Sequence, residues 1–288
     1  MTDTLTPAAA SGAASSPGAD SSPPAAAPLV RREDADGVAL LVLDRPKARN
    51  ALSDATIAAL HAALDAIAAD RSVRAVVLAA EGPAFCAGHD LKELTAHRAD
   101  PDRGRAYFAD LMGRCAAMMQ AIVNLPQPVI AAVHATATAA GCQLVASCDL
   151  AIASSKAAFA TPGVNIGLFC STPMVALSRN VSRKHAMEML LTGDMTSAED
   201  ALRMGLINRV VAPGEERTAA LALAKRIAEK SAVAIRYGKP AFYRQLELPL
   251  AEAYRFASEV MTENMLARDA EEGICAFVEK RPARWEEP

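Results

Sequence analysis

Two short segments of small residues each come after a strand that the sequence predicts to be buried. The first is the loop from Glu81 to Asp90, and the second runs from Ala139 to Ser147 and is expected to be helical. The start of such a helix carries free backbone N–H groups and the positive end of the helix dipole, so it can hold an oxyanion. Taken alone, these segments are explained more simply by tight packing, with Gly88 making only a turn.

Few side chains near these segments could transfer a proton or attack a substrate. His89 carries a titratable imidazole, but packing of the loop is its simpler explanation. Other candidates are expected to be small buried thiols, first-turn acids of a helix, or polar contacts: Cys142 and Cys170, Asp90 and Glu93, Asn165 and Ser171. No serine stands in a convincing nucleophile context with a histidine and an acid, so a ClpP-like protease is disfavoured.

The elements expected around these segments alternate strands with helices before giving way to helices alone. Strands are predicted at 38–43, 75–80, 128–133, 150–153 and 158–160, and helices at 53–69, 104–124, 139–147, 184–192, 197–204, 216–230 and 250–267. This order favours an α/β core followed by a helical tail. A doubly wound dinucleotide-binding fold is set aside because no G-x-G-x-x-G follows the first strand.

Composition limits the possible functions. The 288 residues are 52% hydrophobic and 22% charged with a net charge of −3, which argues against a nucleic-acid partner. The six cysteines form no C-x-x-C pair, so neither a zinc site nor a redox motif is expected, and reduced thiols favour a cytoplasmic location. No apolar run reaches the ~20 residues of a membrane span. Residues 1–28, rich in Ala, Pro and Ser and free of Lys and Arg, are expected to form a disordered arm rather than a targeting peptide.

Four separated stretches together resemble the enoyl-CoA hydratase/isomerase (crotonase) superfamily, from about residue 30 to 285. They are Leu43–Leu52, Phe85–Leu91, Pro128–Val133 with Gly141–Leu144 and Cys148–Ala153, and Leu191–Asp194 with Gly205–Val210. Within the superfamily, the chain is most similar to the branch called enoyl-CoA hydratase domain-containing protein 3. That likeness lies in His89–Leu94, Ala139–Asp149, Phe159–Asn165 and Gly167–Pro173.

The resemblance implies an α/β fold, the crotonase (ClpP/crotonase-like) spiral of ββα units with a C-terminal helical domain. The expected division is a core with the acyl-CoA site at 29–205 and a mainly helical region for subunit packing at 206–288. A homotrimer or a dimer of trimers is the implied assembly. Coenzyme A is implied as part of the substrate, with no separate cofactor and no metal.

The same resemblance gives two backbone donors to the thioester oxygen, the N–H groups of His89 and Ala140. The two catalytic glutamates of the hydratases fall on Gln143 and Gly163. An amide does not titrate near neutral pH and glycine has no side chain, so efficient hydration is expected to be lost. Restoring both acids, as Gln143→Glu with Gly163→Glu, is expected to raise the hydration rate.

Further residues are implied to bind the substrate: Arg45, Lys47, Arg49, Ala87, Gly88, Asp90, Leu91, Gly141 and Lys280. The basic residues would meet the phosphates of coenzyme A, with Lys280 reaching the ribose phosphate of a neighbouring subunit, although a solvated surface explains the charges equally well. Two functions remain open. One is an acyl-CoA enzyme with altered chemistry, such as isomerisation, thioester hydrolysis or weak hydration, and the other is a non-catalytic acyl-CoA binding protein.

Overall fold

The computed structural model describes residues 27–286 and contains two β-sheets. The larger sheet has the order β1-β2-β3-β5-β7-β10 and the smaller one the order β4-β6-β8-β9. The expected disordered arm lies almost wholly outside the described residues. The strands are β1 (Val30–Ala35), β2 (Val38–Leu43), β3 (Ala75–Ala80), β4 (Ala84–Cys86), β5 (Val129–Val133), β6 (Thr136–Thr138), β7 (Leu150–Ser154), β8 (Ala158–Ala160), β9 (Thr196–Ser197) and β10 (Arg209–Val211).

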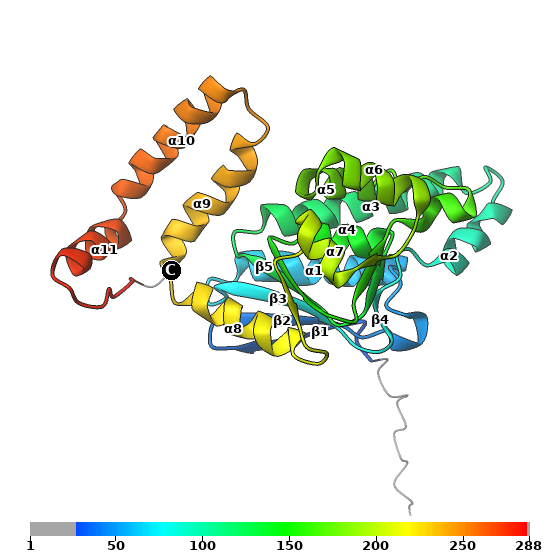
Figure 1. Ribbon diagram of the computed structural model, residues 1–288, viewed down its shortest axis with the longest axis horizontal. Coiled ribbons are helices and arrows are strands. Elements are labelled where there is room, and N and C mark those ends of the chain that lie inside the picture. Colours follow the sequence, from blue (N-terminus) through cyan, green and yellow to red (C-terminus); the bar gives the residue numbers. More distant parts are fainter. Residues whose placement is uncertain (1–26, 287–288) are drawn as a thin grey trace, which may run out of the picture.

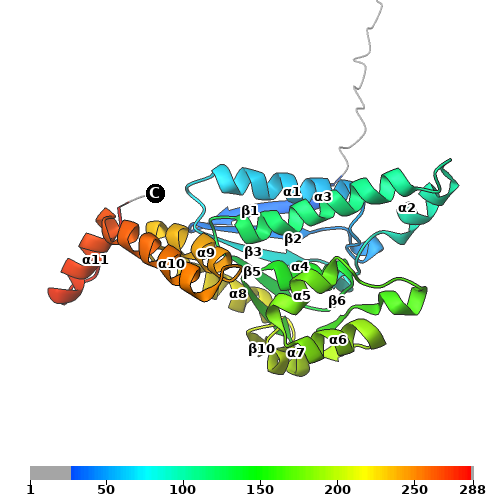
Figure 2. The same ribbon diagram turned by 90° about the horizontal axis from the view of Figure 1, so that it is seen from above.

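The helices cover both faces of the larger sheet and then continue beyond it (Figures 1 and 2). They are α1 (Asp54–Ala69), α2 (Leu91–Ala96), α3 (Arg105–Asn124), α4 (Ala140–Ser147), α5 (Pro173–Asn180), α6 (Arg183–Thr192), α7 (Ala198–Met204), α8 (Glu216–Ala228), α9 (Ala232–Gln245), α10 (Leu250–Met265) and α11 (Arg268–Val278). Three short 3-10 helices are η1 (Pro46–Ala48), η2 (His97–Ala99) and η3 (Pro162–Ile166). This arrangement agrees with the predicted α/β core followed by a helical tail.

The larger sheet is buried on both faces, which explains why its strands read as continuous apolar runs. In β2, Leu41 and Leu43 face one core with α1 and α3, while Leu40 and Val42 face a second core with Ala224 of α8. Strands β2, β3, β5, β7 and β10 run parallel, as expected for a sheet with helices on each face. Segments that follow β3 and β5 therefore leave from the same edge of the sheet.

The α/β packing continues beyond the boundary expected near residue 205. Strand β10 pairs with β7, and α8 packs against the larger sheet through Ala220 and Ala224. The helices that leave the core are α9, α10 and α11, which extend to one side of it (Figure 1). Within residues 27–286, no helix combines the length and apolar character needed to cross a bilayer.

One buried ion pair fixes α9 to the core. Lys239 Nζ lies 2.7 Å from Asp149 Oδ2 and also donates to the carbonyls of Ile122 and Gln127, each at 3.0 Å. Asp149 accepts in addition from the Tyr243 hydroxyl and the Val129 N–H. Burial lowers the pKa of Lys239 and the Asp149 carboxylate opposes that shift. Because every donor and acceptor here is satisfied, the pair holds the first half of the helical region in one position.

We expect Lys239→Ala to destabilise the protein by about 3 kcal/mol, because Asp149 would be left buried without its cation. The matched control is Lys225→Ala, which removes an exposed ion pair with Asp36 and should change little. Urea unfolding of the two variants and the parent chain measures the difference. Equal stability of both variants would show that the buried pair does not anchor α9.

Candidate functional site

The loop after β4 contains His89, whose backbone N–H donates no backbone hydrogen bond within the described residues. Leu52 N donates to the Gly88 carbonyl at 2.7 Å, and Asp90 N donates to the Leu52 carbonyl at 3.2 Å. Leu52 is thus bridged in parallel to His89 and bonds the residues on either side of it. In such a pairing the N–H of His89 itself points away from Leu52. It is therefore free to bind a ligand.

A second free donor lies at the first residue of α4. Ala140 begins this helix, so its N–H has no partner within the helix. Ala139, the residue before it, has a positive φ of 51° and donates its own N–H to the Ala160 carbonyl at 2.9 Å. This conformation is unusual for alanine and turns the chain sharply from β6 into α4. The N-terminus of α4 consequently faces the β4 loop.

Two glycines allow these segments to meet at the closest distance that backbone atoms permit. A Cβ at Gly141 would lie 2.1 Å from the Cys86 carbonyl oxygen, so no side chain fits there. A Cβ at Gly88, whose φ is 90°, would lie 2.9 Å from the Cβ of Ala139 and 3.4 Å from the N of Ala140. The β4 loop, in which His89 follows Gly88, therefore lies against the first residues of α4. Two N–H donors directed at one point would stabilise a developing oxyanion.

Asn50 holds the basic loop against the β4 loop, a role that the sequence did not reveal. Its side chain is fully buried; Oδ1 accepts from the Arg45 N–H, and Nδ2 donates to the carbonyls of Glu81 and Ala84 at 2.7 and 2.8 Å. Both ends of the amide are thus satisfied within one buried cluster. The only sequence signal was a single asparagine that ends the loop 44–50.

Gln143 lies one turn after Ala140, on the same face of α4. It is 5% exposed, and its Oε1 has no hydrogen-bond partner within the described residues. A buried acceptor without a partner is uncommon and leaves an amide able to orient a ligand or a water. It offers no group that titrates near neutral pH.

Gly163 lies in η3 and has no room for a side chain. Its Cβ would stand 2.7 Å from the Leu168 carbonyl oxygen and 2.9 Å from the Cys170 Sγ. The Leu168 N–H also donates to the Gly163 carbonyl at 2.9 Å, so the turn is closed on itself. A glutamate here would require the backbone from Leu168 to Cys170 to move. The double variant Gln143→Glu with Gly163→Glu would therefore change the backbone of this turn as well as add two acids.

Burial shifts the pKa values of the nearby thiols and of the imidazole in the direction that favours their neutral forms. Burial raises the pKa of the Cys142 thiol to about 12. Burial also raises the pKa of Cys170, although an N–H from Gly163 opposes the shift. The pKa of His89 is lowered, chiefly by burial, and neither ring nitrogen makes a hydrogen bond of normal geometry within the described residues. These groups are weak candidates for an activated nucleophile or an imidazolium acid.

The two acids beside the loop have structural partners. Asp90 caps α2 by accepting from the Lys92 N–H and pairs with Arg45 at 2.8 Å. Burial opposes its ionisation, but these hydrogen bonds outweigh burial and lower the pKa of Asp90. Glu93 accepts from the Asp54 N–H at 2.9 Å, at the start of α1. Arg45 is likewise occupied by its pair with Asp90.

The remaining predicted binding residues are not all brought together. Lys47 and Arg49 are exposed on the loop beside the site, and Ala87 and Leu91 are exposed on the loop and helix around His89. Lys280 follows α11 at the far end of the helical region and does not approach these loops within the chain (Figure 1). Asn165 and Ser171 are exposed on the turn that contains Gly163.

Comparison with known proteins agrees with this arrangement. A profile of the enoyl-CoA hydratase/isomerase family matches residues 33–288. The chain belongs to this family. It is 47% identical over 257 residues to the rat protein "Enoyl-CoA hydratase domain-containing protein 3, mitochondrial", covering 89% of this chain and 84% of the relative. The predicted resemblance to that branch is thus confirmed.

Solved structures of related proteins confirm the predicted α/β crotonase fold. A Mycobacterium smegmatis crystal structure titled as an enoyl-CoA hydratase has a TM-score of 0.85 and 54% identity, covering 90% of this chain and 99% of that one. The human enoyl-CoA hydratase domain-containing protein 3 also has a TM-score of 0.85, with 46% identity over 89% of this chain and 100% of its own.

The expected cytoplasmic location is wrong. The rat, mouse and human relatives carry a mitochondrial location in their names, which contradicts it. The argument from reduced cysteines could not separate these locations, because free thiols fit any reducing compartment.

We expect Gly141→Ala to weaken the binding of acetyl-CoA at least about tenfold, because the added methyl group pushes α4 away from Cys86 and separates the two N–H donors. Gly113→Ala in α3 is the matched control, since nothing lies within 4 Å of its added Cβ. Calorimetric titration, with circular dichroism to confirm folding, measures both. A folded Gly141→Ala variant with unchanged affinity would contradict this assignment of the donors.

Proposed function

We propose that this chain binds acyl-CoA thioesters and holds the thioester oxygen between the N–H groups of His89 and Ala140. The observation that carries the proposal is the contact of the β4 loop with the start of α4, because each of these segments carries a backbone N–H without a partner in the described residues. Membership of the enoyl-CoA hydratase/isomerase family supports the same substrate class. Coenzyme A enters only as part of this substrate.

The chemistry proposed for the site differs from hydration by two glutamates. Hydration needs a group that deprotonates water and a group that protonates the α carbon. Gln143 cannot titrate, Gly163 has no space for a side chain, and Asp90 and Glu93 are engaged elsewhere. Reactions that require mainly a stabilised enolate or tetrahedral oxyanion, such as isomerisation or thioester hydrolysis, fit the site better.

A non-catalytic acyl-CoA binding protein is the second candidate. It is favoured by the same pairing of Asp90 and Glu93, because neither is left as a free base beside the two donors. Turnover of a panel of enoyl-, dienoyl- and hydroxyacyl-CoA thioesters separates the two functions. An enzyme converts at least one of them, whereas a binding protein binds several and converts none.

A trimer or a dimer of trimers is part of the proposal. Large apolar side chains on the helical region are exposed in the single chain, among them Leu250 at 75%, Leu266 at 78% and Phe277 at 85%. Faces of this kind are commonly covered by another subunit. The same packing would allow Lys280 to reach a neighbouring acyl-CoA site.

We expect the purified protein to hydrate crotonyl-CoA at least about 10³-fold more slowly than a two-glutamate hydratase, because both proton-transfer groups are missing. Gln143→Glu should raise the rate in part, since it adds one acid and leaves the closed turn at Gly163 unchanged. Hydration is followed by loss of the enoyl absorbance, with Gln120→Glu, the same change at an exposed position of α3, as control. Fast hydration by the unmodified chain would show that another acid performs the reaction.

Charge reversal at Lys47 and at Lys280 should each weaken the binding of acetyl-CoA and make the remaining affinity less dependent on salt, because each removes a cation that would face a phosphate. Lys184→Glu, an exposed lysine on α6, is the control. Titrations at two ionic strengths provide the measurement. Affinities equal to that of the control would assign both lysines to the solvated surface.

A further inference from the structure

The turn between η3 and α5 carries large apolar side chains that are exposed, although hydrogen bonds close its backbone. Ile166 is 59% exposed, Leu168 49% and Phe169 42%. Leu168 N donates to the Gly163 carbonyl at 2.9 Å, and this bond closes the first half of the turn. Ser171 N donates to the Phe169 carbonyl at 2.7 Å and closes the second half. Single exposed apolar residues are ordinary, but a cluster of them on a fixed segment marks a binding surface.

The start of α5 and one face of α6 extend this apolar surface. The two helices pack against each other (Figures 1 and 2). Gly193, which follows α6, meets η3, since an added Cβ would lie 3.0 Å from the Asn165 Nδ2. The exposed side chains of this surface are called the apolar patch and are Ile166, Leu168, Phe169, Met174, Met187 and Leu191.

No charge interrupts the chain along most of the apolar patch. Residues 157–178 contain no Asp, Glu, Lys or Arg. Charged residues make up about a quarter of an ordinary soluble domain, so a stretch of this length without any is unusual where it reaches the surface. An alkyl chain would be removed from water along such a surface, whereas a polar ligand would find no ionic partner there.

The apolar patch adjoins the proposed oxyanion donors. The chain leaves β8 beside the start of α4, where Ala139 N donates to the Ala160 carbonyl at 2.9 Å. After η3 and the turn it forms α5, which packs on α4 and donates from Asn180 Nδ2 to the Ala146 carbonyl at 2.8 Å. Both ends of the segment are therefore fixed to α4, whose first residue carries one of the donors.

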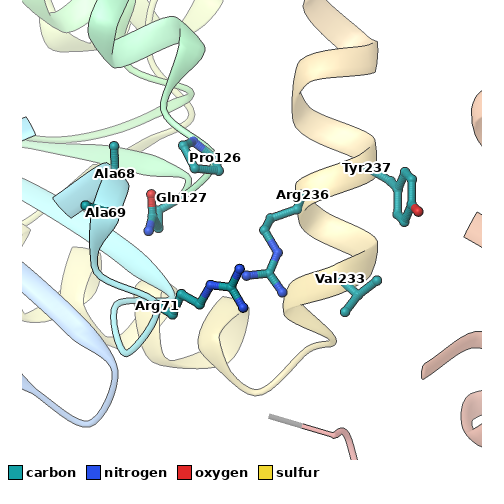
Figure 3. A pocket seen from close by; sticks show the side chains of 8 residues that line it. All are labelled: Ala68, Ala69, Arg71, Pro126, Gln127, Val233, Arg236 and Tyr237. Atoms are coloured by element: carbon teal, nitrogen blue, oxygen red, sulfur yellow. The ribbon is translucent and has the colours of Figure 1, made fainter. Parts of the chain in front are cut away.

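The core behind the donors is filled. Every residue of α4 is buried, and Cys142 and Leu144 belong to the packed core. A cavity of about 610 Å³ does lie between the end of α1 and α9, but Gln127 on its wall precedes β5, whereas the site follows this strand (Figure 3). Strand β3, with six residues, separates these two edges of the sheet by roughly 20 Å. An acyl chain held at the site is therefore directed over the surface, next to the apolar patch.

We propose that the apolar patch binds the acyl chain of the substrate, so that the protein prefers straight-chain thioesters of medium or greater length. This inference rests on the proposed function, because His89 and Ala140 must hold the thioester for its chain to reach the patch. The flexible side chains of Met174 and Met187 adapt to chains of different length. Each methylene group buried on the patch strengthens binding up to about fourfold.

Calorimetric titration of the protein with coenzyme A, acetyl-CoA and decanoyl-CoA, each below its micelle-forming concentration, tests the proposal. We expect decanoyl-CoA to bind at least about 100-fold more tightly than acetyl-CoA, because burial of about half of the added methylenes suffices for that gain. Leu168→Ser should weaken the binding of decanoyl-CoA at least about fivefold and leave that of acetyl-CoA unchanged. Leu202→Ser changes an exposed leucine of α7 outside the apolar patch, and this matched control should alter neither affinity.

Two results of these titrations would overturn the proposal. One is an equal affinity for acetyl-CoA and decanoyl-CoA, and the other is an equal effect of Leu168→Ser and Leu202→Ser on decanoyl-CoA binding. Light scattering on the same variants tests a different occupant, a second copy of this chain. A smaller assembly in Leu168→Ser, with an unchanged preference for decanoyl-CoA, would assign the patch to a subunit contact and contradict the proposal.

The chain-length preference and the proposed function fail separately. Binding of acetyl-CoA without any dependence on chain length would refute the role of the apolar patch and leave the proposed thioester site intact. Absence of binding by every thioester would refute the proposed function itself.

Discussion

The close contact between the β4 loop and the start of α4 is the constraint on which the site depends. Gly141 meets the Cys86 carbonyl so closely that no side chain could stand between them, and every residue of α4 is buried. Ala139 adopts an unfavourable backbone conformation, which costs about 1–3 kcal/mol and allows α4 to begin directly after β6. The burial of α4 and the bond from Ala139 to Ala160 offset that cost.

Much of the core could be predicted because local pattern and tertiary structure agree there. Ser53 caps α1 as expected, and Ile57, Leu60, Leu64 and Ile67 form its buried face. The sequence did not predict strand β1, because this edge strand pairs with β2 alone and its charged, largely exposed residues lack the apolar pattern of a buried strand. Helix α9 was missed because Pro240 interrupts its pattern, whereas contacts distant in sequence hold it to Asp149.

The candidate site was predictable only in part, for a similar reason. Family resemblance predicted the two donors, His89 and Ala140, and the contact between the β4 loop and α4 supports this prediction irrespective of the side-chain type at His89. The pairing of Asp90 with Arg45 and of Glu93 with the Asp54 N–H joins residues 39 to 45 positions apart, so no local pattern could show it. The same is true of Asn50, whose amide connects segments more than 30 residues apart. The predicted loss of two catalytic glutamates rests on the residue types of Gln143 and Gly163 alone, and it stays a prediction.

The two backbone N–H groups of His89 and Ala140 are proposed to bind the thioester oxygen. Infrared difference spectroscopy of bound acetyl-CoA, with the thioester carbonyl labelled with ¹³C, tests it most directly. Hydrogen bonds from His89 and Ala140 polarise the carbonyl, so its stretching band should move to lower frequency than in water and narrow as the oxygen is fixed. A band at the frequency and width of free acetyl-CoA, under conditions where binding is saturated, would contradict the claim.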